Sequence, residues 1–317
     1  MTNNLMNEVD FLAFDSRYKS LLKSNVSLID KVIAYLCKKR GKFIRPALVV
    51  NVAKSLGSLD DKNYTVASLI EMIHLATLVH DDIVDEAYFR RGWPTIGRIW
   101  KNKISLLIGD YIFSRSLSAI IKLDDLESIK VLSNTSDRLS KGEIFQIQEA
   151  RSGIISEENY YAMIKDKTAS LFSAACELSA RASSSNYLDF DNFRNFGENF
   201  GIAYQIKDDM NDILGTKSIL GKPVILDVKR NTLTLPYIYC LDQLNKKEKK
   251  EFLYKIKRLS KTNKRKEIAK LVNDFKGLDY CKNEINRHID LALRCIEKYP
   301  KKENFINLIE TVFNEKK

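Results

Sequence analysis

The chain has 317 residues, 44% of them hydrophobic, and a formal net charge of +11, so it can bury a sizeable core as one large domain or two small ones. No stretch of about 20 residues is apolar without charge, which argues against a transmembrane helix, and the N-terminus lacks the pattern of a signal peptide. Five cysteines without CxxC spacing are typical of reduced intracellular thiols, so we expect a cytoplasmic protein.

Helical periodicity predicts an all-α protein. Only 12 Gly and 5 Pro interrupt the chain, and apolar residues recur at steps of three and four residues, without strand alternation. No internal boundary stands out, so we predict a single domain over residues 1–317. The predicted helices cover residues 5–38, 46–56, 64–87, 104–121, 126–149, 156–181, 190–214, 233–244 and most of the remainder to 313.

Lys42, Arg45 and Pro46 form the first candidate site, in the sequence GKFIRP. Proline is favoured in the first turn of a helix, and free N–H groups at that end attract anions. Basic side chains just before the helix could therefore hold a phosphate group. Two basic residues that merely flank a helix start are the structural alternative.

Asp81, Asp82 and Asp85 close an apolar run, in the sequence DDIVDEAYFRRG. On a helix, Asp81 and Asp85 lie one turn apart on one face and repel each other, which favours a cation between them. Mg²⁺ prefers oxygen ligands and is usually held by one or two carboxylates together with substrate phosphates. The alternative for this motif alone is a solvated helix end.

Asp208, Asp209 and Asp212 repeat the same spacing at the end of a second apolar run, GIAYQIKDDMND. The C-terminus of a helix disfavours negative charge, so stability does not explain two such triads. Together they favour a site in which several Mg²⁺ ions surround one diphosphate.

Basic residues crowd the segments 246–250 and 257–270. No recognition motif or row of aromatic residues accompanies them, so we interpret them as solvated helix faces and expect no nucleic-acid partner.

With these motifs the chain resembles the trans-isoprenyl diphosphate synthases, or polyprenyl synthetases, most closely the bacterial long-chain (octaprenyl-type) members. That family has DDxxD followed by RRG, and GxxFQxxDDxxD, in this order, and the resemblance runs from Gly41 to about residue 300. It implies an isoprenoid-synthase-type helical bundle with a central cavity, a homodimer, and the Mg²⁺-dependent head-to-tail condensation of isopentenyl diphosphate with an allylic diphosphate such as farnesyl diphosphate.

The resemblance also implies which residues act, position by position. His74 matches the family's ExxH, Lys167 and Thr168 its KT motif, and Glu143 and Gln146 a recurrent inward-facing segment of less defined role. The implied ligands of isopentenyl diphosphate are Lys42, Arg45, His74 and Arg91. The implied ligands of the allylic diphosphate are Arg90, Lys167, Thr168, Gln205 and Lys222. The implied metal ligands are Asp81, Asp85 and Asp208, with Asp82, Asp209 and Asp212 as further candidates.

The implied catalytic set is Asp81, Asp82, Asp85, Lys167, Thr168, Gln205 and Asp208. We expect His80 to hydrogen-bond beside the first triad and His288 to lie on the surface. The chain departs from the family at Thr232, where a Lys is usual, and Lys229 or Arg230 could compensate.

Ala76 and Thr77 lie where short-chain family members often place a bulky residue. Small side chains there favour a long, octaprenyl-like product for a quinone side chain, with the tunnel floor on the following helix near residues 112–120. The alternatives are a short-chain synthase that makes farnesyl or geranylgeranyl diphosphate, and a non-catalytic partner subunit of a heteromeric synthase.

Overall fold

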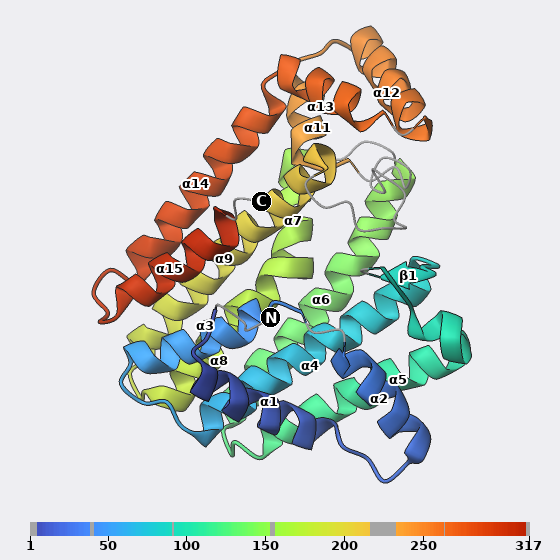
Figure 1. Ribbon diagram of the computed structural model, residues 1–317. Coiled ribbons are helices and arrows are strands. Elements are labelled where there is room, and N and C mark those ends of the chain that lie inside the picture. Colours follow the sequence, from blue (N-terminus) through green and yellow to red (C-terminus); the bar gives the residue numbers. More distant parts are fainter. Residues whose placement is uncertain are drawn as a thin grey trace.

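The computed structural model describes residues 5–38, 41–90, 92–152, 156–215, 233–262 and 264–314, and this part of the chain is almost wholly helical (Figure 1). The all-α prediction is therefore confirmed. The helices of the first half are α1 (Glu8–Leu22), α2 (Ser27–Lys38), α3 (Ile44–Ser55), α4 (Asp61–Val84), α5 (Ile96–Ile121) and α6 (Leu126–Ser152). Those that follow are α7 (Glu157–Ile164), the π-helix η1 (Lys165–Ala169), α8 (Ser170–Ser183), α9 (Tyr187–Leu214), α11 (Leu235–Asp242), α12 (Lys246–Lys261), α13 (Arg265–Asp274), α14 (Gly277–Cys295) and α15 (Lys302–Phe313).

Helix α4 is the central helix that presents the first acidic triad. A capping box starts it: the Asp60 carboxylate accepts from the backbone N–H groups of Lys62 and Asn63, and the Asn63 side chain accepts from the Asp60 N–H. Residues 65–73 are buried on every side of the helix, as expected for an element with neighbours all round. The helix ends at Val84, so the triad lies at its C-terminal end, as predicted.

Helix α9 presents the second triad in the same way. Asn186 caps its start, and Gly215, with φ 73°, ends it in the left-handed conformation that glycine tolerates. Gly197 and Gly201 allow α9 to contact its neighbours at the backbone. A Cβ atom at Gly197 would lie 2.5 Å from the Phe172 carbonyl oxygen, and one at Gly201 would lie 2.6 Å from the Ala169 Cα.

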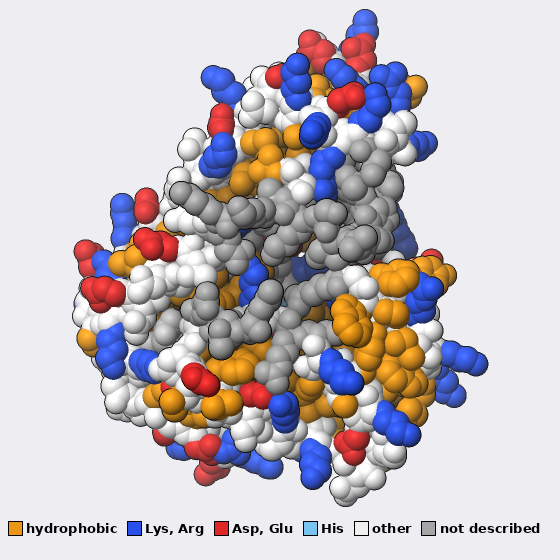
Figure 2. All heavy atoms as spheres, in the orientation of Figure 1, with side chains coloured by type: hydrophobic (Ala, Val, Ile, Leu, Met, Phe, Trp, Pro, Cys, Tyr) orange, Lys and Arg blue, Asp and Glu red, His pale blue; other side chains and the backbone are white. Residues whose placement is uncertain are grey.

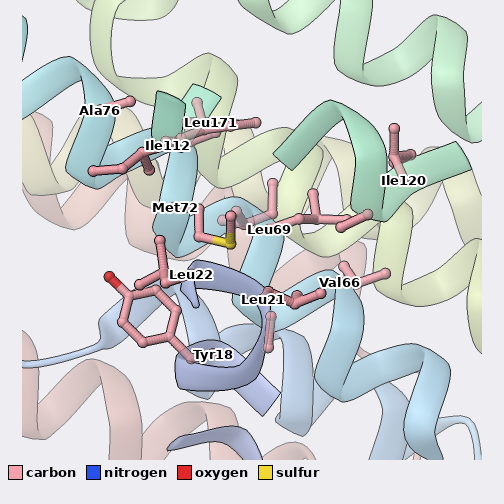
Figure 3. Close-up of a cluster of buried hydrophobic side chains, with 14 of the residues drawn as sticks. Tyr18, Leu21, Leu22, Val66, Leu69, Met72, Ala76, Ile112, Ile120 and Leu171 are labelled. Atoms are coloured by element: carbon pink, nitrogen blue, oxygen red, sulfur yellow. The ribbon is translucent and has the colours of Figure 1, made fainter. Parts of the chain in front are cut away.

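Three clusters of buried side chains hold the helices together. The first joins α1, α4, α5 and α8, and Figure 3 shows Ala76 at the same end of it as Ile112 and Leu171. The second joins α7, α9 and the helices from α11 to α14. The third joins α3 and α15 to α8, α9 and α14. Helices α4, α8 and α9 are thereby fixed at the centre of the bundle, and they position the candidate site.

Several predicted boundaries were wrong. Residues 5–38 form two helices, because the chain turns at 23–26, where the Asp30 carboxylate accepts from the Ser24 N–H at 3.0 Å. Residues 156–181 are divided by η1. A two-residue ladder, β1 (Phe89–Arg90) with β2 (Trp93–Pro94), was not predicted at all.

Helix α5 bears on the expectation that the chain has no transmembrane helix. By length and composition it could span a membrane, but 39% of its apolar stretch is buried, and its packing against α4 is the most extensive between any two described helices. One such helix is weak evidence for a membrane span, since the core helix of a soluble protein passes the same test. Its outer face exposes Ile99, Leu106, Leu107, Leu117 and Ile121.

Candidate active site

The first triad combines a buried carboxylate with an ion pair. Asp81 is largely buried, and no side chain or backbone group of the described residues forms a hydrogen bond or ion pair with its carboxylate. Burial, and to a lesser degree Glu143 and Asp85, raise its pKa to about 6, although Lys167 and Arg90 oppose the shift. Asp82 accepts a hydrogen bond from Nε of Arg90 at 2.7 Å. Asp81 is thus a partly desolvated carboxylate that forms no direct ion pair with a described residue, although the charges of Lys167 and Arg90 act on it.

Lys167 lies beside Asp81 because the backbone bulges there. It belongs to η1, and such π-helical turns occur frequently at functional sites. Gly142 on α6 makes room for the bulge, since a Cβ atom there would lie 2.6 Å from the Lys167 backbone nitrogen. The Lys167 ammonium forms an ion pair with Glu143, which follows Gly142 on α6. Nε of Arg138 on α6 donates a hydrogen bond of 2.6 Å to the carboxylate of Asp166 in η1.

A chain of side-chain hydrogen bonds links η1 to the second triad. Thr168 donates to the Gln205 side-chain oxygen at 2.7 Å, and the Gln205 nitrogen donates to one Asp209 oxygen at 2.7 Å. The fully buried Tyr160 donates to the other Asp209 oxygen at 2.6 Å. Both Asp209 oxygens are therefore engaged within the protein.

The three aspartates of the second triad differ in environment. Asp208 is exposed, Asp209 is 7% exposed, and Asp212 is half-buried, 3.8 Å from Arg265 on α13. Within the described ranges, no three carboxylate, imidazole or thiol groups are close enough to hold a metal ion by themselves. The carboxylates of the described residues therefore do not complete a metal site by themselves.

Arg45 on α3 contacts α8. Its guanidinium carbon lies 4.1 Å from the centre of the Phe172 ring, and its buried Nε has no hydrogen-bond partner among the described residues. Burial lowers the pKa of Arg45, an effect that Glu71 opposes. Phe43, just before α3, has a left-handed backbone (φ 53°) and packs edge-on against Phe14 at 5.2 Å. The contact anchors Phe43 in the core, whereas the preceding Lys42 is exposed.

His74 is half-buried on α4, and its backbone oxygen accepts a hydrogen bond from Thr77 at 2.9 Å. Arg91, Lys222 and Thr232 lie outside the described residues, as do Lys229 and Arg230. The structure therefore brings together the C-terminal end of α4, Glu143, Lys167, Thr168, Gln205 and Asp209.

Two histidine predictions need correction. His80 lies 3.2 Å from Asp110 on α5 rather than against the triad, in space left by the absent side chain of Gly109. His288 is 6% exposed, not on the surface; it hydrogen-bonds Asn199 at 2.8 Å and lies against Tyr161. Burial lowers its pKa to about 4.

Comparison with known proteins identifies the family of the chain. The family model "Polyprenyl synthetase" matches residues 26–275. The chain belongs to the polyprenyl synthetase family. It is 31% identical over 282 residues to an octaprenyl diphosphate synthase of Haemophilus influenzae, covering 89% of this chain and 86% of that protein. It is 35% identical over 242 residues to heptaprenyl diphosphate synthase component 2 of Bacillus subtilis, covering 76% of this chain and 69% of that protein.

A solved polyprenyl synthase of Caulobacter crescentus, complexed with calcium and isoprenyl diphosphate, superposes with a TM-score of 0.87 at 26% identity, covering 96% of this chain and 94% of that one. The curated relatives of this polyprenyl synthetase are prenyl diphosphate synthases, which places it in the prenyltransferase class of enzymes.

The sequence analysis missed the residues that support the site. Tyr160, Glu143 as the partner of Lys167, and the bulge at η1 were not predicted. The sequence did contain a signal for the close packing of α9 against η1 and α8. Gly197 and Gly201 lie four residues apart on one face of α9, and small residues at that spacing let two helices approach closely.

Proposed function

We propose that the chain is a long-chain polyprenyl diphosphate synthase that joins isopentenyl diphosphate head-to-tail to an allylic diphosphate. The observation that carries the proposal is Asp81, a largely buried carboxylate of raised pKa that forms no direct ion pair with a described residue and lies near the Lys167–Glu143 pair. Such a carboxylate favours a cation that arrives with the substrate. The family membership and the octaprenyl and heptaprenyl relatives support the same reaction.

Isopentenyl diphosphate would be held by Lys42, Arg45, His74 and Arg91. Arg45 gives the strongest structural support, because its buried Nε has no acceptor among the described residues and its guanidinium lies over the Phe172 ring. A buried donor without a partner costs about 1–3 kcal/mol, which a diphosphate oxygen would recover.

The allylic diphosphate would bind Arg90, Lys167 and Lys222, whose charges stabilise the leaving diphosphate as the C–O bond ionises. Arg90 uses only Nε for Asp82, so its two terminal nitrogens make no hydrogen bond to a described residue. Thr168 and Gln205 hold each other in fixed orientation, and their oxygens would face the allylic cation. The double bond of isopentenyl diphosphate then attacks this cation, and the departing diphosphate accepts the proton that is lost.

The donor set fits Mg²⁺, because Asp81, Asp85 and Asp208 offer only carboxylate oxygens. We propose that these three hold the metal, that Asp82 instead orients Arg90, and that Asp209 instead orients Gln205. When bound, Mg²⁺ supplies positive charge between the carboxylates and the diphosphate. The Caulobacter protein, complexed with calcium and isoprenyl diphosphate, supports the use of a divalent cation in this family.

Ala76 and Thr77 support a long product. Ala76 is 1% exposed and belongs to the cluster that also contains Ile112 and Ile120 on α5, where we place the end of the tunnel. The alternatives are a short-chain synthase of the same family and a subunit that needs a partner. The name "component 2" of the Bacillus relative keeps the second alternative open, and both intact acidic triads argue against a non-catalytic chain.

We further propose one domain over residues 1–317, a cytoplasmic location and a homodimer. The free cysteines among the described residues support an intracellular location. The apolar outer faces of α5 and α6, which expose Leu106, Leu107, Ile144 and Ile147, support the dimer, since a contiguous exposed apolar surface marks an interaction site. Light scattering of the purified protein tests the dimer directly.

The decisive test is a product assay with labelled isopentenyl diphosphate, farnesyl diphosphate and Mg²⁺, with chain lengths resolved by chromatography. Products of about eight isoprene units support the full proposal. Short products alone retain the chemistry and overturn the chain-length argument. Absence of any Mg²⁺-dependent product from the isolated chain favours the partner-subunit alternative.

A further inference from the structure

Positive charge is concentrated in one part of the molecule. Residues 246–276, from α12 to the start of α14, contain thirteen Lys and Arg against four Asp and Glu, so this segment has a net charge of +9 out of +11 for the chain. All thirteen cations except Lys249 and Arg265 are exposed. Of the exposed ones, only Lys264 forms an ion pair with a described residue, Glu267 at 2.8 Å.

Helix α12 arranges part of this charge on one face. Phe252, Ile256 and Leu259 are buried in the second cluster and fix the inner face of the helix. Residues at steps of three and four on the opposite side form what we call the lysine stripe: Lys246, Lys250, Tyr254, Lys257 and Lys261. Tyr254 lies at the centre of the lysine stripe and is 69% exposed. Figure 2 shows Lys and Arg side chains crowded over the end of the molecule where α12 and α13 lie.

We propose that the lysine stripe is a docking surface for a membrane with anionic lipid headgroups. Basic residues on an amphipathic surface helix gain favourable energy at such a membrane, and tyrosine is enriched at the boundary between water and lipid. The apolar side of α12 is already buried in the protein, so the interaction is electrostatic and peripheral rather than an insertion.

The composition of the segment favours lipid over nucleic acid. Eleven of its thirteen cations are Lys, which acts as a point charge, whereas recognition of nucleic-acid phosphates and bases favours the planar fork of Arg. Tyr254 is also the one exposed aromatic side chain on α12, so the helix offers no row of rings on which bases could stack.

The location of the stripe suggests what docking achieves. Arg265 at the start of α13 lies 3.8 Å from Asp212, so the basic helix pair α12–α13 is adjacent to the second acidic triad. A membrane held there is close to the site where the proposed product, with its long apolar tail, is formed. The link between docking and product formation rests on the proposed function, whereas binding of the stripe to a membrane does not.

The test is co-flotation of the full chain with vesicles of phosphatidylcholine, with and without phosphatidylglycerol. The stripe variant replaces Lys246, Lys250, Lys257 and Lys261 with Gln. The matched control variant replaces four exposed lysines that have an acidic partner on their own helix, and so loses the same charge: Lys19, Lys130, Lys141 and Lys282. Thermal unfolding of both variants checks that they fold.

We expect the wild type to float with anionic vesicles only, and to be released at about 1 M salt, where the Debye length falls to about 3 Å. The stripe variant should bind on the order of 600-fold more weakly, because each of the four basic residues contributes roughly fivefold, and the control variant should bind as the wild type does. An equal loss in both variants means that net charge alone acts, and overturns the assignment.

Full binding by the stripe variant would assign lipid contact to another surface, such as the apolar face of α5. That result would also overturn the assignment of the lysine stripe as the docking surface. So would preferential capture of the wild type by DNA in competition with the vesicles. None of these readouts uses catalysis, so failure of the proposed function leaves the test intact.

Discussion

Tyr160 and Asp209 lie on different helices, and the Tyr160 hydroxyl donates a hydrogen bond of 2.6 Å to one Asp209 oxygen. The second Asp209 oxygen accepts from Gln205, so the carboxylate fixes the orientation of the Gln205 amide. The Gln205 oxygen then faces Thr168. Burial and the adjacent Asp209 raise the pKa of Tyr160 well above its usual value, so the hydroxyl remains a donor at every physiological pH. Tyr160 is therefore a positioning residue for Thr168 and Gln205.

Replacing Tyr160 with Phe should lower kcat about tenfold while changing KM for either substrate little, because the fully buried hydroxyl is engaged by Asp209 and acts only through Gln205 and Thr168. The unpaired Asp209 oxygen should also cost about 1–3 kcal/mol of stability. Steady-state kinetics and chemical unfolding measure the two effects.

Tyr161→Phe is the matched control. Its hydroxyl donates to Glu284 at 2.7 Å, away from Thr168 and Gln205. The control should lose stability but retain kcat. Equal losses of kcat in the two variants would show that the first effect is general destabilisation rather than positioning.

The raised pKa of Asp81 gives a prediction about pH. An unfolded Asp titrates near 3.8, whereas Asp81 in the folded chain titrates at about 6, so the folded state binds more protons between these values. Stability contributed by this group therefore falls as pH rises from about 4 to about 6, and the penalty persists at neutral pH.

Asp81→Asn should remove that penalty and raise the unfolding free energy at pH 7 by about 2–3 kcal/mol in metal-free buffer, while abolishing synthase activity. The gain should vanish at about pH 4, where the wild-type carboxyl is protonated. Urea unfolding at the two pH values measures it. A gain of the same size at both pH values would contradict an electrostatic origin.

Periodicity was sufficient to predict the all-α fold and the position of both triads, because the apolar pattern of α4 and α9 continues directly into the acidic residues. It was not sufficient to find the break at η1. The residues 156–181 have a continuous helical pattern, and the bulge depends on the absence of a side chain at Gly142, on a helix distant in sequence. Tertiary contact decides that geometry.

The roles within each triad likewise could not be predicted from spacing. Asp208 and Asp209 are neighbours in the sequence, yet one is exposed and the other is engaged by Tyr160 and Gln205. His288 was expected at the surface, because no motif in the sequence gives it a partner. Its burial follows from Asn199 and Tyr161, which approach it only in the folded chain.

Lys101 lies in α5 with φ 72° and ψ 155°, a combination that is nearly restricted to glycine. Lys101→Gly should therefore raise the unfolding free energy by about 1 kcal/mol or more. Lys103→Gly, two residues further along and in helical conformation, should lower it by about 1 kcal/mol. Thermal melts of the two variants separate these effects, and destabilisation by both would show that the backbone at Lys101 is not strained.

Ala76 provides the test of product length. It is 1% exposed on α4, one turn and one residue before Asp81, and belongs to the same buried cluster as Ile112 and Leu171 (Figure 3). A larger side chain there should block the growing tail, so products should shorten in steps through Ala76→Val, Ala76→Leu and Ala76→Tyr. The number of isoprene units in each product is resolved by chromatography.

Overpacking of the core is the competing cause of any change, since it typically costs about 1–3 kcal/mol. Ala180→Leu tests it, because Ala180 is equally buried but belongs to the third cluster, away from Ala76. This control should lose stability and make products of wild-type length. If the Ala76 series lowers total turnover without shortening the product, the tail does not pass Ala76 and the tunnel follows another face of α4.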